Sequence, residues 1–142
     1  LEFRRVLFRS MILASVDVYP DEIREIIAGG VPVTFIQQNP GKDVPAVMID
    51  NYGGMAELTT HLIGHGYKRF AYITGTNHTP DNAERLRAVR ETLDGHGLHL
   101  PKERIVEGNY LRGSGYRAMF NLLDLAERPD IVIADLNVGI HR

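Results

Sequence analysis

The fold is decided by one stretch, His61–Gly75, which reads HLIGHGYKRFAYITG. A helix with one apolar face runs into Gly64 and Gly66, and glycines commonly end helices because they accept the left-handed backbone conformation. Bulky apolar residues then predict a strand over 69–74, which ends at Gly75. A helix followed at once by a buried strand predicts one unit of a parallel α/β sheet.

Apolar periodicity on either side of this stretch predicts strands and helices that alternate along the chain. Strands are expected at 11–14, 31–36, 46–49, 69–74, 105–106 and 131–134, and helices at 20–28, 51–64, 82–95 and 114–125. Asp50 or Asn51 can cap the second helix, and Ser114 can cap the last. This alternation predicts parallel strands joined by right-handed crossovers.

Polar residues follow the predicted strands at their carboxyl ends. They occupy 37–39, 50–51, 75–78 and 107–110. In open parallel sheets, ligands bind beyond the carboxyl ends of the strands. Donors, acceptors and an aromatic ring gathered at one edge predict a cleft for a small polar ligand.

Composition excludes several classes of protein. The 142 residues suffice for one domain or two small lobes, and the net charge of −2 comes without a basic cluster that would bind nucleic acid. No stretch has the roughly 20 apolar residues that span a bilayer. The absence of Cys excludes disulfides and thiol chemistry.

Catalytic and metal-binding motifs are also missing from the sequence. The glycines form neither a phosphate loop nor a dinucleotide fingerprint, and Ser114 lacks the glycine spacing of a nucleophile elbow. His61 and His65 have metal-ligand spacing, but Leu62 stands where zinc hydrolases carry a Glu. We therefore expect no enzyme, no cofactor and no metal.

Two residues remain ambiguous from spacing alone. Arg85 could bind hydroxyls, a carboxylate or a phosphate through its guanidinium, or it could be one of several solvated arginines on its helix. Tyr110 could stack on a sugar or base ring, or it could be a half-buried loop residue. Without further information the plainer alternative is favoured for both.

Five groups of residues, in order and at coherent spacing, resemble the effector-binding domain of LacI/GalR-type bacterial transcriptional regulators. They are Ile49-Asp50-Asn51 with Gly53-Gly54; the stretch 61–75, similar to the join between the two lobes; Arg85-Leu86 with Arg90-Glu91 and Leu93; His96-Gly97-Leu98; and 107–110 with Ser114-Gly115-Tyr116. The resemblance implies an α/β fold of the type I periplasmic-binding-protein-like class, here as two incomplete parallel-sheet lobes with flanking helices. The lobes are expected at 11–66 and 67–136.

The resemblance also implies a binding site. Arg85 matches the arginine that contacts the effector, and Tyr110 matches the aromatic residue that stacks over it. Asp50 and Asn51 match positions at the edge of the cleft. After the last strand the sequence departs from the family's Ala-Asn-Asp, so Asp135 and Asn137 are both candidates for the effector-contacting residue.

Both ends of the sequence differ from the family pattern. Residues 1–10 resemble the translation of a sequencing-library adapter, and we interpret them as non-native. Residues 137–142 are interpreted as a truncated or non-native tail. Two more departures follow the effector arginine, where Ala88 and Val89 replace a Gly and an aromatic residue of the family.

The function that the resemblance implies is sensing of a small-molecule effector, a sugar or sugar derivative, within a cytoplasmic DNA-binding repressor. Operator DNA would be bound through an N-terminal helix-turn-helix that this sequence lacks, and the full-length protein would be a homodimer with no membrane partner. The alternative is a periplasmic sugar- or solute-binding protein of an ABC transporter with the same fold.

Overall fold

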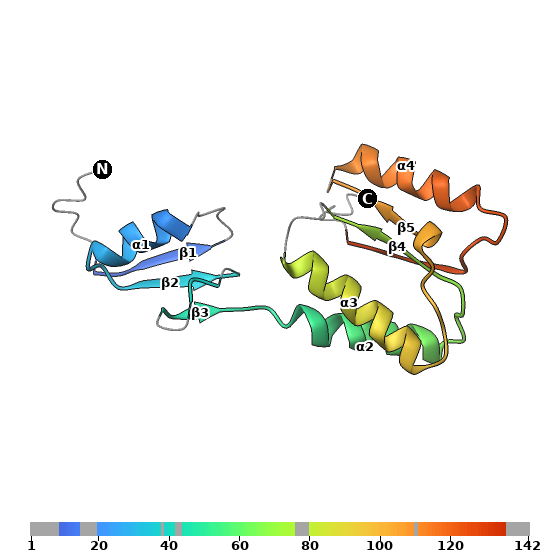
Figure 1. The fold of residues 1–142 in the computed structure, drawn as a ribbon, viewed down its shortest axis with the longest axis horizontal. Coiled ribbons are helices and arrows are strands. Elements are labelled where there is room, and N and C mark those ends of the chain that lie inside the picture. Colours follow the sequence, from blue (N-terminus) through green and yellow to red (C-terminus); the bar gives the residue numbers. More distant parts are fainter. Residues whose placement is uncertain are drawn as a thin grey trace. The chain divides into compact units, whose positions relative to one another are not determined.

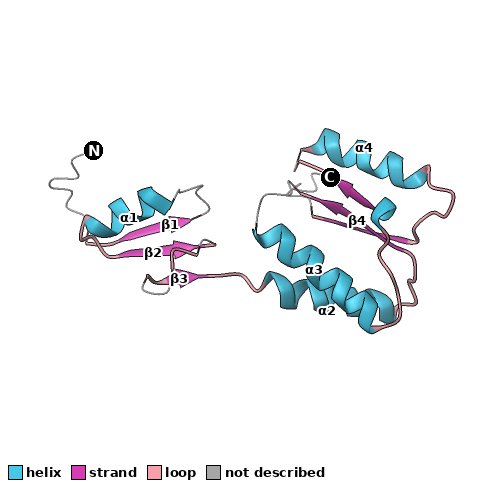
Figure 2. Ribbon diagram, viewed as in Figure 1, coloured by secondary structure: helices cyan, strands magenta, loops and turns pink. Residues whose placement is uncertain are grey.

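The computed structural model describes residues 9–14, 20–37, 39–41, 44–75, 80–109 and 111–135. The chain forms two compact units, divided between Ile49 and Asp50 (Figure 1). The elements, coloured by type in Figure 2, are β1 (Met11–Ala14), α1 (Pro20–Ala28), β2 (Val33–Ile36), β3 (Ala46–Val47), α2 (Asn51–Gly64), β4 (Phe70–Thr74), α3 (Pro80–Gly95), a 3-10 helix (Lys102–Arg104), β5 (Ile105–Glu107), α4 (Arg112–Leu123) and β6 (Ile131–Ala134).

The first unit is a small parallel sheet with the strand order β1-β2-β3 and the helix α1. Its core consists of Ile23 from α1 and of Val33 and Phe35 from β2. These β2 residues alternate with Thr34, because successive side chains of a strand point to opposite faces. Ile12, on β1, is 69% exposed.

The second unit has three layers around a parallel sheet with the strand order β5-β4-β6. Helices α2 and α3 cover one face and α4 covers the other (Figure 1). The central strand β4 is buried along its whole length, as expected for a strand with helices on both faces.

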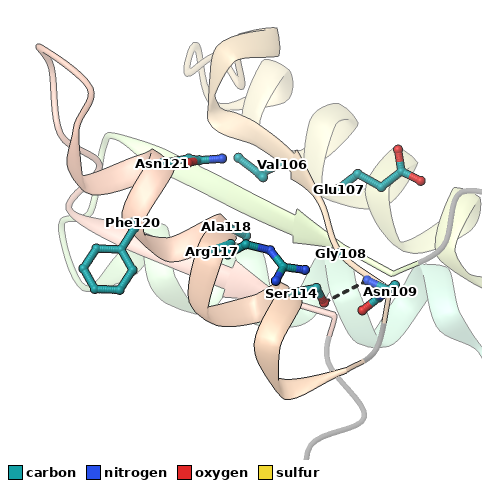
Figure 3. A pocket seen from close by; sticks show the side chains of 9 residues that line it. All are labelled: Val106, Glu107, Gly108, Asn109, Ser114, Arg117, Ala118, Phe120 and Asn121. Carbon is teal, nitrogen blue, oxygen red and sulfur yellow. Dashed lines mark hydrogen bonds between the residues drawn. The ribbon is translucent and has the colours of Figure 1, made fainter.

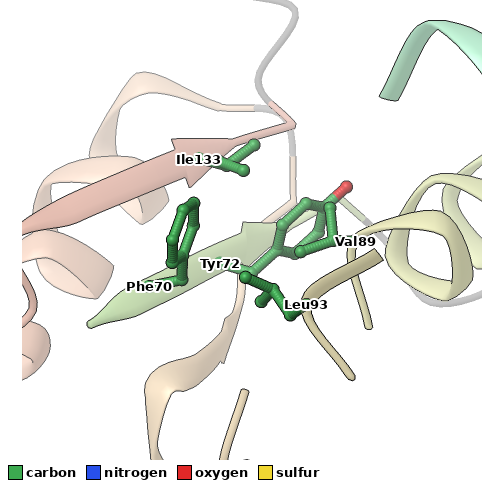
Figure 4. Close-up of a cluster of buried hydrophobic side chains, with 5 residues drawn as sticks. All are labelled: Phe70, Tyr72, Val89, Leu93 and Ile133. Atoms are coloured by element: carbon green, nitrogen blue, oxygen red, sulfur yellow. The ribbon is translucent and has the colours of Figure 1, made fainter. Parts of the chain in front are cut away.

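Alternate side chains of β4 build the two cores of this unit. Phe70 and Tyr72 pack with Val89 and Leu93 of α3 and Ile133 of β6 (Figure 4). On the opposite face, the other core contains Ala71 and Ile73 of β4 together with Ala118 and Leu122 of α4.

The predicted order of strands and helices is confirmed, and several details differ. Strand β3 ends at Val47 rather than at residue 49. The prediction that Ser114 caps the last helix is wrong, since the cap is Leu111 and Ser114 lies inside the first turn. There the Ser114 hydroxyl donates to Leu111 O and accepts from the backbone N–H of Asn109.

The observed division of the chain differs from the expected boundary at residue 66. Helix α2 belongs to the second unit, because Met55, Leu62 and Ile63 pack against the core formed by β4, α3 and β6. Asp50 caps this helix as expected, with its Oδ1 accepting from Gly53 N at 2.7 Å. Gly66, with a φ of 88°, ends the turn that follows.

No helix among the described residues combines the length and the apolar character needed to cross a membrane.

Candidate functional site

The guanidinium of Arg85 joins two other predicted site residues at the carboxyl-terminal end of the second unit's sheet. Its Nε donates to Oδ1 of Asn51 at 2.7 Å, and its Nη1 donates to Oδ1 of Asp135 at 2.5 Å. We refer to Arg85, Asn51 and Asp135 as the Arg85 cluster. Three separate segments therefore converge on one cation.

The fold explains why these segments meet. Asp135 directly follows β6, and its backbone N–H donates to Ile73 O of β4 at 2.8 Å, so its position is set by the sheet. Asn51 is the first residue of α2, and Arg85 lies in the second turn of α3. The carboxyl ends of parallel strands and the amino ends of the helices that follow them share one side of an α/β unit.

A second set of contacts holds the beginning of α2 against α3. The Tyr52 hydroxyl donates to Oε2 of Glu91 at 2.6 Å, and the Arg87 guanidinium lies 4.4 Å from the centre of the Tyr52 ring. The hydrogen bond to Glu91 raises the pKa of the Tyr52 phenol, and burial and the Glu91 charge raise it further, whereas the Arg87 charge lowers it. Because Tyr52 adjoins Asn51, these contacts position Asn51 beside Arg85.

Burial and charge make the Arg85 cluster suited to polar ligands. Asn51 is 7% exposed, Asp135 is 8% exposed and the Arg85 side chain is 27% exposed. Oδ2 of Asp135 is buried and has no hydrogen-bond partner among the described residues. Among the described residues, Arg85 uses two of its five N–H donors, both within the cluster, and its other donors lie beside this acceptor. A buried acceptor next to free donors can bind a group that both donates and accepts, such as a hydroxyl.

The remaining predicted site residues either make another contact or lie outside the described residues. The carboxylate of Asp50 caps α2, a contact that accounts for this residue without a ligand. Tyr110 and Asn137 lie outside the described residues, and so does the loop 76–79.

Sequence reasoning overlooked Asn82, which is 2% exposed in the first turn of α3. It precedes Arg85 by three residues and therefore lies on the same side of the helix. The sequence did contain a signal for Asn82, because it is a polar residue one helical turn before the candidate site residue Arg85. Thr74, 1% exposed at the end of β4, is a second buried polar residue that the sequence pattern did not indicate.

A cavity of about 530 Å³ lies elsewhere, between β5 and α4 (Figure 3). Its lining includes Asn109, Ser114, Arg117 and Asn121 and none of the Arg85 cluster. Within the described ranges, no group of three or more His, Asp or Glu residues is arranged to hold a metal ion.

Comparison with known proteins identifies the family. Residues 8–138 match the family described as periplasmic binding proteins and the sugar-binding domain of the LacI family. The chain belongs to this family, which confirms the periplasmic-binding-protein-like α/β fold.

The similar curated proteins are transcriptional regulators. The regulator CelR of Thermobifida fusca is 37% identical over 95 residues, which cover 67% of this chain and 28% of CelR. Catabolite control protein A of Priestia megaterium is 29% identical over 124 residues, which cover 86% of this chain and 37% of that protein. The chain thus spans about a third of the length of these relatives.

Solved structures of LacI-family regulators share the fold. A regulatory protein from Chloroflexus aggregans superposes with a TM-score of 0.79 at 22% identity, over 89% of this chain and 46% of that one. A sugar-binding regulator from Escherichia coli, solved with phosphate, has a TM-score of 0.77 at 24% identity with the same coverage.

Proposed function

We propose that this chain is the effector-sensing part of a LacI-type transcriptional regulator, and that the Arg85 cluster binds the effector. The observation that carries the proposal is the paired Arg85 and Asp135, with a buried Oδ2 that lacks a partner among the described residues. A buried acceptor without a partner costs about 1–3 kcal/mol, and a ligand hydroxyl would recover that cost.

A sugar or sugar derivative is the effector class that fits this chemistry. Neighbouring hydroxyls can accept from the guanidinium N–H groups that have no partner among the described residues, and they can donate to the Asp135 carboxylate. The negative charge of Asp135 already balances Arg85, which favours a neutral polyhydroxylated ligand over an anion. Tyr110 is proposed to stack on the apolar face of the sugar ring.

In the full-length regulator, the effector would act by binding one arrangement of the protein better than another. A ligand shifts such an equilibrium only by its differential affinity, and the shift changes the affinity for operator DNA by linkage. We propose that the full-length protein is a cytoplasmic homodimer and that operator DNA is bound by a helix-turn-helix domain outside these residues.

A periplasmic solute-binding protein is the second candidate, because the matching family includes such proteins. The curated relatives named above are regulators, which favours the first proposal. The two candidates differ in whether sugar binding changes the affinity for DNA.

The proposed function is tested in a full-length relative that carries the equivalent arginine. Replacing that arginine by Ala should abolish the response to the effector and leave operator binding in the absence of effector unchanged. The residue equivalent to Arg90 is the matched control: it is an exposed arginine on the same helix and belongs neither to the Arg85 cluster nor to the contacts around Tyr52, so its Ala variant should still respond. An unchanged response in the first variant would contradict the proposal.

A further inference from the structure

Two histidines lie side by side at the carboxyl-terminal end of α2, where the chain turns toward β4 (Figure 1). His61 is in the last turn of the helix and His65 is its C-cap, so the two are one helical turn apart on the same face. Their imidazole rings are 4.5 Å apart, centre to centre, with an angle of 69° between the ring planes. Both residues are exposed to solvent. We call them the α2 histidine pair.

Backbone hydrogen bonds fix the spacing of the α2 histidine pair. The N–H of His65 donates to His61 O at 3.2 Å and to Leu62 O at 3.1 Å, which keeps the last turn of the helix closed. Gly66 ends the turn directly afterwards, with a φ of 88° and an N–H that donates to Ile63 O at 2.9 Å. The backbone therefore holds both histidines one turn apart before any ligand binds.

The α2 histidine pair differs from two other histidines of the second unit in its contacts. Within the ranges that the structure describes, neither imidazole of the pair forms a hydrogen bond or an ion pair, and the rings contact each other. By contrast, Nδ1 of His96 lies 2.8 Å from Thr92 O, and Nδ1 of His99 lies 2.7 Å from Oδ1 of Asp94. Local contacts thus account for His96 and His99, whereas the ring nitrogens of the α2 histidine pair can bind a ligand.

The separation of the two rings suits chelation of a divalent metal ion. An ion bound at about 2.0–2.1 Å from an imidazole nitrogen lies about 3.2 Å from the centre of that ring. Two rings with centres 4.5 Å apart can therefore share one ion with an angle of about 90° at the metal. This is the angle between neighbouring positions of square-planar and octahedral complexes, which Cu²⁺ and Ni²⁺ form, whereas tetrahedral Zn²⁺ requires a wider angle.

A site with two protein ligands is open, and water can fill the remaining positions around the ion. The described residues contain no group of three or more His, Asp or Glu that could complete the site. Leu62, in place of a Glu, argues against hydrolytic chemistry but not against chelation. The partial negative charge at the end of α2 also favours a cation. The expectation of no metal, which rested on hydrolase motifs, is therefore revised for this pair.

We propose that the α2 histidine pair chelates a divalent transition-metal ion, with Cu²⁺ bound most tightly, and that the ion clamps the last turn of α2. Cu²⁺ has the highest affinity because it leads the order of divalent first-row ions at nitrogen ligands. His61 follows Asn51 by about 15 Å along the helix axis, so the metal site is separate from the Arg85 cluster. The proposal is independent of effector binding and can fail or succeed without it.

Titration of the untagged 142-residue chain with copper(II) chloride, in a buffer that does not bind metals, tests the site. We expect one tight equivalent of Cu²⁺ whose electron paramagnetic resonance spectrum shows two nitrogen ligands. His65→Ala should weaken this equivalent by about tenfold or more, since losing even a residue that only orients a ligand costs about 10–100-fold. His99→Ala is the matched control: His99 is exposed and contacts Asp94, so its loss should leave the affinity unchanged.

A rescue experiment distinguishes chelation from the mere number of histidines. Glu57 is exposed and lies one turn before His61 on the same helix face. Adding Glu57→His to His65→Ala therefore restores two histidines at the same spacing, and we expect the tight equivalent to return. Adding Thr60→His to His65→Ala should not restore it, because adjacent helix residues face different directions.

Stability gives a second readout, because an ion that binds only the closed last turn of α2 stabilises the folded state. Cu²⁺ should raise the urea midpoint of the native chain and leave that of the double variant His61→Ala/His65→Ala unchanged. The proposal is overturned if the native chain binds Cu²⁺ no more tightly than this double variant. It is also overturned if His65→Ala binds as the native chain does, or if the histidines introduced at residues 57 and 60 restore binding equally.

Discussion

Arg85 and Asp135, which are 50 residues apart in the sequence, form an ion pair with Nη1 and Oδ1 separated by 2.5 Å. The pair links the second turn of α3 to the end of β6. It therefore joins the helix that carries the candidate effector arginine to the sheet edge where ligands of α/β folds bind.

Removing Arg85 should destabilise the chain more than neutralising Asp135. Arg85→Leu leaves the carboxylate of Asp135, only 8% exposed, without its cation, at a cost of about 3 kcal/mol. Asp135→Asn leaves a guanidinium that is 27% exposed and still bonded to Asn51, at a cost of about 1 kcal/mol. Urea denaturation of both variants measures the difference. If Asp135→Asn proved less stable than Arg85→Leu, the result would contradict a buried ion pair between these residues.

Gly108 should not tolerate a side chain. A Cβ at this position would lie 2.7 Å from the carbonyl oxygen of Thr74, an atom of the central strand that cannot move freely. Gly108→Ala should cost about 1–3 kcal/mol. Gly54→Ala is the matched control: nothing lies within 4 Å of its Cβ, and the change should stabilise α2 by about 0.5–1 kcal/mol. Equal thermal midpoints for the two variants would contradict the close approach at Gly108.

Two leucines on neighbouring helices should differ strongly in their effect on stability. Leu93 of α3 is fully buried in the core with Phe70 and Tyr72, so Leu93→Ala should cost about 2–5 kcal/mol. Leu58 of α2 is 42% exposed, and Leu58→Ala should cost less than about 1 kcal/mol. Chemical denaturation checks both values, and similar losses would contradict the packing of α3 on the sheet.

The Tyr52 phenol should titrate above the ordinary pKa of tyrosine, chiefly because its O–H donates to Glu91. Since the folded state holds this proton more tightly than the unfolded state, the contribution to stability is present below the ordinary tyrosine pKa. It is lost as the pH rises through the folded pKa. Carbon NMR of the labelled tyrosine ring should show the Tyr52 titration moving to lower pH in Glu91→Gln. An unmoved titration would show that Glu91 does not set the pKa.

Much of the fold was predictable because strong local signals agreed with one another. The stretch 61–75 combines a helix end, a Gly at positive φ and a buried strand, and each of these appears in the structure. The division between the units was not predictable from the same signals. Helix periodicity shows which face of α2 is apolar, but it does not show that β4 and α3 supply the surface on which Met55 and Leu62 pack.

The Arg85 cluster was predictable only in part. Spacing alone favoured a solvated arginine, and the family resemblance was needed to single out Arg85. The pairing with Asp135 depends on two crossovers that bring β6 beside β4, which no local pattern encodes. Ser114 shows the opposite case, because its hydroxyl makes cap-like contacts although the helix starts earlier, at Arg112.

The most direct test of effector binding is a titration of the labelled chain with a panel of neutral monosaccharides and disaccharides, followed by NMR of the Arg85 Nε–H and the Asn51 side-chain amide. We predict that at least one sugar shifts both signals together in a saturable manner, and that Arg85→Lys abolishes the response. If no sugar moves these signals, or if binding moves only the side-chain amides of Asn109 and Asn121 in the cavity beside α4, the Arg85 cluster is not the effector site.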